Sequence, residues 1–350
     1  GTGTAITAGL SEIQMPNVVT WETATKYNIG VESAWFDSSL SMNIDFFKER
    51  REDILTNPKR YVLAAGAVGL PPYNFGIVEN KGFEMELGWN STIGKVNYYL
   101  KGIYAFNRNK VIEKSEAAKP YPYMYEAGLP IKQFIGYQYD GFFSSYDEIA
   151  SSPQQFGLTN LKPGDIKYKD INGDGIVDEN DQAPIGYSTV PEMTYSLQLG
   201  ASYKGFDVSV MFQGAARSSV YLYQDLGWDN MTGNYYEEHI NRWTPETAAT
   251  ATYPRFLQGS KESHQNYYLS DFWLKDGKYL RLKNVMISYT FDKKMLRKTP
   301  FSSLKIFASG FNLITWDKLK KVDPEVAPSS NTGYFYPQQR QYNMGINVSF

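Results

Sequence analysis

The sequence predicts an all-β protein, a transmembrane antiparallel β-barrel with long extracellular loops. Three observations favour this fold class. Apolar and polar side chains alternate with a period of two along nine segments of the chain. These segments are about nine to thirteen residues long, and the connections between them are alternately short and long. A soluble β-sandwich is the competing fold class, because its strands also alternate.

The first four segments are 23–36, 38–50, 81–90 and 95–107. In each, one face is aromatic or aliphatic and the other carries Lys, Glu, Asn or Ser. The apolar faces are Tyr27, Ile29, Val31 and Trp35, then Leu40, Met42, Ile44 and Phe46, then Phe83, Met85, Leu87 and Trp89, then Tyr98, Leu100, Tyr104 and Phe106. Such alternation is typical of strands with two different environments.

The last five segments are 192–203, 205–214, 279–291, 304–316 and 341–350. Their apolar faces include Leu197 and Leu199, Val208 and Val210, Val285 and Ile287, and Met344 and Ile346. Only 304–316 is ambiguous, because Phe307, Phe311 and Leu313 oppose Ile306 and Ala308. We expect nine strands in all.

Strand length and connection length favour the membrane. A tilted membrane strand needs about 9–11 residues, whereas strands of globular sheets usually have about 5–6. The short connections lie near Asp37, at Asn90–Gly94, at Lys204–Gly205 and over roughly a dozen residues before 304. The long ones are 51–80, 108–191, 215–278 and 317–340. Outer-membrane barrels sort their loops in this way, with the long loops outside.

The alternation of short and long connections also determines on which side of the membrane each connection lies. The final strand ends on the periplasmic side, so segment 131–143 belongs inside the second long loop and is not a crossing. Nine strands cannot close a regular antiparallel barrel, so we expect further strands from sequence outside this chain. We expect the polar faces to line the lumen; they carry Lys26, Glu32, Glu84, Glu86, Lys101, Gln198, Arg281 and Lys283.

Composition excludes several kinds of site. Cysteine is absent, which removes disulfides and thiolate chemistry, and the two histidines, His239 and His264, are too far apart for a short metal motif. The formal net charge of −2 gives no indication of nucleic-acid binding. No apolar run is long enough for a membrane helix. The segment beginning at Gly1 lacks the features of a signal peptide, so we expect the start of an exported product to lie elsewhere.

One motif, at 170–181, has the spacing of a calcium-binding loop. Its oxygen donors would be Asp170, Asn172, Asp174, the carbonyl of Ile176, Asp178 and Asp181. Gly175 allows the sharp turn, but position 12 is Asp181 where Glu is usual. The alternative is a turn that its own side chains stabilise without an ion. We predict a structural Ca²⁺ that braces the 108–191 loop.

The chain resembles the C-terminal portion of SusC/RagA-type TonB-dependent outer-membrane transporters. Nearly the whole chain takes part in the resemblance. The segments that carry it are WETATKYNIG at 21–30, NKGF at 80–83, 164–181, YKGFDVSVMFQG at 203–214, NRWTP at 241–245, 279–290, GFNLITW at 310–316 and the terminal 343–350. The resemblance implies the last nine strands of a 22-strand barrel, with the plug and earlier strands outside this sequence.

The resemblance also implies a function, TonB-dependent import across the outer membrane. Members pair with a SusD-like lipoprotein lid, take energy from TonB–ExbB–ExbD through their N-terminal part, and carry oligosaccharides or oligopeptides. No catalytic residues are expected. Aromatic residues of loop 215–278, among them Trp228, Tyr235 and Trp243, are candidates to contact cargo. The alternatives are a secreted calcium-stabilised β-sandwich carbohydrate-binding module and an extracellular hydrolase, which would need a close carboxylate pair.

Overall fold

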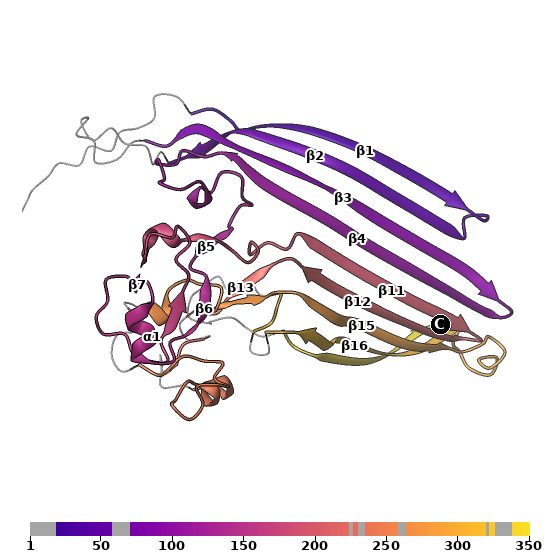
Figure 1. Ribbon diagram of the computed structural model, residues 1–350. Helices are drawn as coiled ribbons and strands as arrows, with labels where there is room; N and C mark the ends of the chain where they lie inside the picture. The colour runs from indigo at the N-terminus through magenta and orange to yellow at the C-terminus, as the bar shows by residue number, and fades with distance from the viewer. Residues whose placement is uncertain are drawn as a thin grey trace, which may run out of the picture. The chain divides into compact units, whose positions relative to one another are not determined.

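A computed structural model describes residues 19–57, 71–223, 227–229, 235–257, 264–319, 322–325 and 338–350. Its main element is a nine-stranded sheet in the order β1-β2-β3-β4-β11-β12-β15-β16-β17 (Figure 1). The strands are β1 (Thr23–Trp35), β2 (Leu40–Thr56), β3 (Tyr73–Ile93), β4 (Val96–Glu113), β11 (Met193–Tyr203), β12 (Phe206–Ala216), β15 (Tyr279–Thr290), β16 (Ser303–Asp317) and β17 (Gln341–Ser349).

All nine predicted strands are present, and neighbours in the sheet follow sequence order. From β4 to β17 every neighbouring pair is antiparallel. The strands extend further than the sequence predicted at one end, since β3 has 21 residues and begins at Tyr73. The soluble β-sandwich alternative is wrong, because the described residues contain this one large sheet and four two-stranded sheets.

Short elements fill the second and third long connections. Segment 131–143 holds two of them, β5 (Phe134–Gly136) and β6 (Tyr139–Phe142), and neither joins the large sheet. This confirms that the segment is not a crossing. The small sheets are β5 with β10 (Ala183–Ile185), β6 with β8 (Ile166–Tyr168), β7 (Gln154–Gln155) with β9 (Ile176–Val177), and β13 (Ser219–Tyr221) with β14 (Leu274–Asp276). Among the described residues, one short α-helix, α1, covers Tyr146–Ser151.

The chain divides into two compact units. Unit 1 consists of Gly1–Asn28, Phe47–Lys81 and Arg108–Ile131, so it contains one end of each of the first four strands. Unit 2 consists of Ile29–Phe46, Gly82–Asn107 and Lys132–Phe350. Unit 2 therefore carries most of the large sheet together with all four small sheets. No helix among the described residues is both long enough and apolar enough to cross a membrane.

The turn between β11 and β12 shows why these strands meet in a tight hairpin. Lys204 and Gly205 have φ values of 48° and 89°, the left-handed pair that a two-residue hairpin turn requires. The Gly205 carbonyl accepts the N–H of Thr290 at 2.8 Å, which ties the turn to β15. A Cβ at position 205 would collide with the Thr290 carbonyl, so both conformation and space require glycine there.

Two aromatic clusters form the core of the connections in unit 2. Tyr137, Ile166, Tyr168 and Val177 are buried in one cluster, which joins the 132–191 segment to Tyr268 and Phe272 of the next long connection. The second contains the buried Trp228, Tyr253, Tyr267 and Trp273. Burying aromatic rings supplies the stability that unstructured loops lack. The two long connections are therefore packed structures with cores of their own.

Helix α1 is fixed to this structure by one carboxylate. Glu148 accepts hydrogen bonds from the hydroxyl of Ser144 at 2.6 Å and from its backbone N–H at 2.8 Å. It also pairs with Lys167 of β8 at 2.9 Å. The hydrogen bonds from Ser144, followed by that from Lys167, lower the pKa of Glu148 to about 2. The ionised carboxylate therefore links the helix to the β6–β8 sheet.

We predict that this link depends on pH. Because the folded pKa is lower than the unfolded one, the stabilisation is complete above the unfolded pKa of about 4.5 and is lost as pH falls toward 2. In Glu148→Gln, amide hydrogen exchange over 144–152 should be faster than in the parent protein at pH 7, by about five- to tenfold for about 1 kcal/mol. The difference should shrink at pH 3 and below. A pH-independent difference would contradict this role of Glu148.

Candidate functional site

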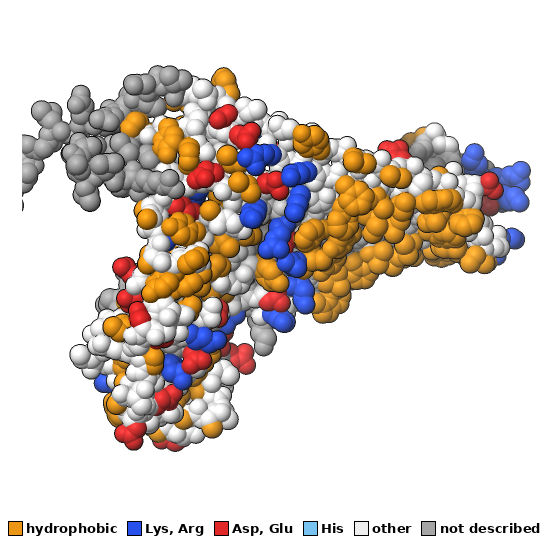
Figure 2. Space-filling model, turned by 45° about the horizontal axis from the view of Figure 1, so that its top comes forward, with side chains coloured by type: hydrophobic (Ala, Val, Ile, Leu, Met, Phe, Trp, Pro, Cys, Tyr) orange, Lys and Arg blue, Asp and Glu red, His pale blue; other side chains and the backbone are white. Residues whose placement is uncertain are grey.

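One surface of unit 2 is a continuous apolar face of the large sheet (Figure 2). Leu197, Ile287 and Ile346 have 37%, 51% and 64% of their surface exposed, and Val210 is half-buried. None of them is enclosed in a protein interior, as the barrel prediction requires. Soluble proteins do not expose so large an apolar face. Other exposed side chains of this face are Ile29, Val31, Leu100, Tyr203, Phe206, Val208, Ile306, Ile314, Trp316, Tyr342, Met344 and Val348.

A bulge in β15 explains why its polar and apolar residues do not follow one strict alternation. The register of β15 with both neighbours shifts between Leu282 and Asn284, so Lys283 lies opposite no residue of β12 or β16. Side chains exchange faces across such a bulge. Arg281 and Lys283 therefore share the polar face even though they have the same parity as Val285. In β16, Ile306 pairs with Ile346, so the ambiguous strand places Ile306 on the apolar face of the sheet.

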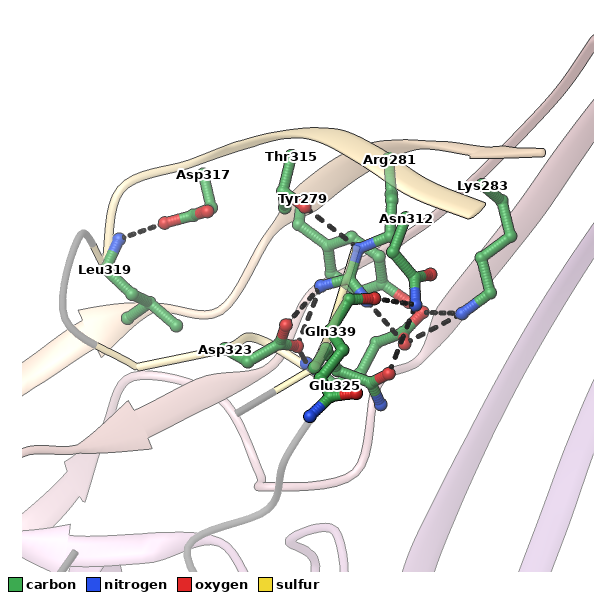
Figure 3. A network of polar contacts seen from close by, with 11 residues as sticks. Tyr279, Arg281, Lys283, Asn312, Thr315, Asp317, Leu319, Asp323, Glu325 and Gln339 are labelled. Atoms are coloured by element: carbon green, nitrogen blue, oxygen red, sulfur yellow. Dashed lines mark hydrogen bonds and ion pairs between the residues drawn. The ribbon is translucent and has the colours of Figure 1, made fainter. Parts of the chain in front are cut away.

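The polar face of β15 carries a buried ion-pair network (Figure 3). The side chain of Arg281 is only 1% exposed. Its Nη2 lies 2.6 Å from the Asp323 carboxylate, its Nη1 lies 2.8 Å from that of Glu325, and its Nε donates to the Thr315 hydroxyl at 2.9 Å. Lys283 pairs with Glu325 at 3.0 Å. Two cations thus face two carboxylates.

This network attaches the fourth long connection to strands β15 and β16. Thr315 lies opposite Arg281 in the ladder, whereas Asp323 and Glu325 come from the connection that follows β16. The hydroxyl of Tyr279 also donates to Glu325, at 3.0 Å. Buried charges are tolerated only when they are paired and hydrogen-bonded. The sequence predicted Arg281 and Lys283 on the polar face, but it did not indicate their carboxylate partners.

The predicted calcium loop folds around its own side chains. Asp170 accepts the N–H of Gly173 at 2.7 Å and that of Gly175 at 2.8 Å. Asp181, which is completely buried, accepts the N–H of Ile171 at 2.7 Å and that of Asp178 at 2.9 Å. The spacing of the motif therefore brings positions 1 and 12 into the same loop. Their remaining lone pairs are of the hard-oxygen type that Ca²⁺ prefers.

The remaining positions of the loop also bind its backbone. Asn172 accepts the N–H of Asp174, and Asp174 accepts the N–H of Ile176, both at 2.9 Å. Asp178 accepts the N–H of Asn180 at 2.7 Å. In the part of the chain that the structure describes, no group of three or more His, Cys, Asp or Glu side chains converges as metal ligands would. The Ca²⁺ site stays a prediction.

The three aromatic candidates for cargo contact have different environments. Trp228 is only 2% exposed and packs against Tyr267 at a ring separation of 4.7 Å, so it belongs to the loop core and is not available to cargo. Tyr235 is 56% exposed and lies 5.4 Å from the Phe256 ring. Trp243 is half-buried, and its ring covers Gly164. Of the three, only Tyr235 presents a largely exposed ring.

A hollow that the sequence did not predict lies beside the Asp-rich loop. It has a volume of about 680 Å³. Its lining includes the rings of Tyr137, Phe156 and Tyr268 together with the polar side chains of Glu179 and Gln182. Gln182 is oriented by its hydrogen bond to the Tyr137 hydroxyl at 2.9 Å. Aromatic faces with a few oriented polar groups are typical of ligand sites.

Comparison with known proteins agrees with this architecture. The sequence profile described as "TonB dependent receptor-like, beta-barrel" matches residues 2–313. The chain belongs to this receptor family. Proteins of the family with the SusC/RagA type of barrel lie in the outer membrane, and so does this one.

Relatives of the receptor family are distant in sequence. TonB-dependent receptor P3 of Formosa agariphila is 26% identical over 94% of this chain and 34% of its own length. SusC of Bacteroides thetaiotaomicron is 22% identical over 94% of this chain and 32% of its own length. This chain thus spans about a third of the length of the curated relatives it matches. They are named as receptors, not as enzymes.

Solved structures of a peptide importer share the fold. The RagAB peptide importer in its open-open state superposes with a TM-score of 0.71 at 20% identity, covering 95% of this chain and 35% of the other. The closed-closed state gives a TM-score of 0.70 at 21% identity, with 95% and 36% coverage. At this identity the likeness establishes the fold. Together with the family match, it confirms the barrel that the strand pattern predicted.

The Arg281 network provides a test of how the fourth connection is held. In Arg281→Met, Asp323 and Glu325 would lose their main cation while remaining buried, which costs about 3–5 kcal/mol. We expect the heat-modifiable gel shift of the complete protein to occur at lower temperature and proteolysis within 317–340 to be faster. Arg297→Met is the matched control, because Arg297 is exposed and should change stability by less than about 0.5 kcal/mol. Equal behaviour of the two variants would contradict a structural role for Arg281.

Proposed function

We propose that the complete protein is a TonB-dependent active importer of oligosaccharides or oligopeptides that works with a SusD-like lipoprotein lid. The observation that carries the proposal is the nine-stranded sheet with one lipid-facing apolar side and one polar side. Its fold likeness to the RagAB peptide importer supports the same function. A sheet of this kind separates hydrocarbon from a water-filled passage.

The packed connections of unit 2 would form the extracellular part of the passage. The aromatic clusters hold segments 132–191 and 264–278 together, and the Arg281 network fixes residues 322–325 to the wall. Cargo would therefore meet a shaped surface whose loops are already ordered. A preordered surface loses less entropy when it binds cargo or a lid. Energy would come from TonB–ExbB–ExbD, acting through parts of the receptor outside this chain.

The hollow beside the Asp-rich loop is the best candidate for cargo contact. Tyrosine and phenylalanine rings stack on sugar rings and on peptide side chains, while Glu179 and Gln182 can accept or donate hydrogen bonds. This chemistry fits both cargo classes. The mixture of rings and neutral or acidic groups does not favour a strongly anionic cargo.

The import function predicts both a partner and an energy requirement. The complete protein, purified gently from outer membranes, should bring down a lipoprotein together with a bound oligomer that mass spectrometry can identify. Uptake of that oligomer by whole cells should fall to background when TonB is deleted, because passive barrels do not need it. Uptake that persists without TonB would contradict active import. Loss of uptake in Tyr268→Ala with normal assembly would assign the hollow to cargo.

We propose further that Ca²⁺ binds the 170–181 loop and braces the connection from 108 to 191. The support is the spacing of Asp170, Asn172, Asp174, Ile176, Asp178 and Asp181, and a fold that brings the two ends of the loop together. Ca²⁺ is common outside cells, so even a weak site would be filled.

A chelator should then loosen this loop without unfolding the barrel. After chelation we expect faster proteolysis within 108–191, with the heat-modifiable gel shift and the cleavage of 215–278 unchanged. The Asp174→Asn variant should show this faster proteolysis within 108–191 even without chelator. The substitution weakens an ion site but keeps an oxygen that can accept the N–H of Ile176. If chelation leaves protease sensitivity unaltered, the loop is held by its side chains alone.

A further inference from the structure

Four cations gather in the turn between β15 and β16. Residues 292–300 contain Lys293, Lys294, Arg297 and Lys298, and all four side chains are exposed. We name these four residues the basic turn; they belong to unit 2. Figure 1 shows the turn at the end of β15 and β16 that is remote from the small sheets of the same unit. It therefore lies on the side of the short connections.

The positive charge of the basic turn is not balanced by the protein. The turn holds one carboxylate, that of Asp292, which accepts the N–H of Lys294 at 3.0 Å. Within the part of the chain that the structure describes, none of the four cations forms an ion pair. The neighbouring hairpin turn adds a fifth cation, Lys204, and Gly205 beside it accepts the N–H of Thr290 at 2.8 Å. An excess of cations on an exposed surface points to an anionic partner.

The residues before the turn belong to the lipid-facing side of the sheet. Tyr289 pairs with Phe206 of β12 and with Ile306 of β16, and residues paired across neighbouring strands share a face. Phe206 and Ile306 are 55% and 44% exposed on that side. The ring of Tyr289 lies 4.5 Å from that of Phe206 and 4.9 Å from that of Phe291. The apolar face of unit 2 thus ends in an aromatic group beside the turn.

The basic turn contacts this aromatic group directly. The hydroxyl of Tyr289 donates to the sulfur of Met295 at 3.8 Å, while Leu296 is buried and holds the turn in place. Met295 is nevertheless 59% exposed, so an apolar side chain lies among the cations. After the turn, the ring of Phe301 lies 5.4 Å from that of Phe350, which is 86% exposed at the end of β17. Aromatic residues therefore flank the cations on both sides.

The position of the basic turn identifies its partner. Aromatic belts of outer-membrane barrels mark the boundary between hydrocarbon and headgroups. The turn comes directly after such residues, and every contact that places it there lies within unit 2. It is therefore at the depth of the headgroups, where the anionic groups of a membrane are phosphates. Cations next to an exposed apolar side chain are typical of surfaces that bind anionic membranes.

We propose that the basic turn binds the phosphate groups of anionic phospholipids in the leaflet on its side of the membrane, with Met295 among the acyl chains. Arg297 offers two parallel hydrogen bonds to a phosphate, and each lysine acts as a point charge. A single Lys or Arg near an anionic membrane surface strengthens binding about fivefold. Bound lipid would fix the short-turn end of β15 and β16 at the membrane surface.

The test compares lipid phosphate with free phosphate. The complete protein in mild detergent is titrated with phosphatidylglycerol, with phosphatidylcholine and with inorganic phosphate, and bound lipid is counted by native mass spectrometry. We expect phosphatidylglycerol to bind at least about tenfold more tightly than phosphatidylcholine, and its binding to weaken as salt is added. Inorganic phosphate at the same concentration should not displace the lipid, because it has no acyl chain to contact Met295.

The variant K293Q/K294Q/K298Q should bind phosphatidylglycerol about tenfold or more weakly than the parent protein, approaching its affinity for phosphatidylcholine. The matched control is K132Q/K162Q/K278Q, which removes three exposed lysines from the long connections of unit 2. It should bind phosphatidylglycerol as the parent protein does. Heat-modifiable migration checks folding; if the first variant fails this check, K298Q alone should give a smaller loss in the same direction.

Three outcomes would overturn the proposal. The first is a folded K293Q/K294Q/K298Q or K298Q variant that binds phosphatidylglycerol as tightly as the parent protein. The second is an equal loss in the control variant, which would mean that binding follows net charge and not the basic turn. The third is displacement of the lipid by inorganic phosphate, which would mean that the turn recognises a soluble anion. None of them bears on import, because the turn is remote from the connections proposed to meet cargo.

Discussion

Hydrocarbon offers no hydrogen-bond partner to a protein backbone, and this constraint determines the structure. Every N–H and C=O of a crossing strand has to pair with a neighbouring strand. Strand β11 meets it completely, because all 11 of its residues are paired on both sides, with β4 and with β12. The same constraint applies to the outer edges of β1 and β17, where the sheet ends. The lipid-facing apolar side and the alternation in the sequence both follow from this pairing.

Alternation made the fold predictable, but only where both faces of a strand are constrained. All nine strands were predicted, because lipid demands an apolar side chain at every second position. The prediction was less accurate where strands continue into water. Strand β3 begins at Tyr73, eight residues before the predicted 81. In a strand exposed to water, polar residues such as Asn74 and Glu79 are tolerated as well as apolar ones, so no alternation marks this part of the strand. Secondary structure outside the membrane leaves no comparable pattern.

The candidate sites were predictable only in part. Local spacing predicted that 170–181 folds into one loop, and its carboxylates do bind successive backbone N–H groups. Long-range partners leave no such signal. Asp323 and Glu325 pair with Arg281 across 42 and 44 residues. The sequence around Trp228 likewise gives no indication that its ring packs against Tyr223 and Tyr267. Those contacts depend on how two distant segments pack. The hollow beside Tyr137 depends on the same packing.

Charged side chains on the polar face of the sheet are arranged in pairs. On the polar face, protein groups neutralise the charges. Arg281 is paired with Asp323 and Glu325 and has almost no exposed surface, and Arg51 is shared between Glu49 and Glu22. Such pairing suits a passage, because an unpaired charge there would hold any oppositely charged cargo.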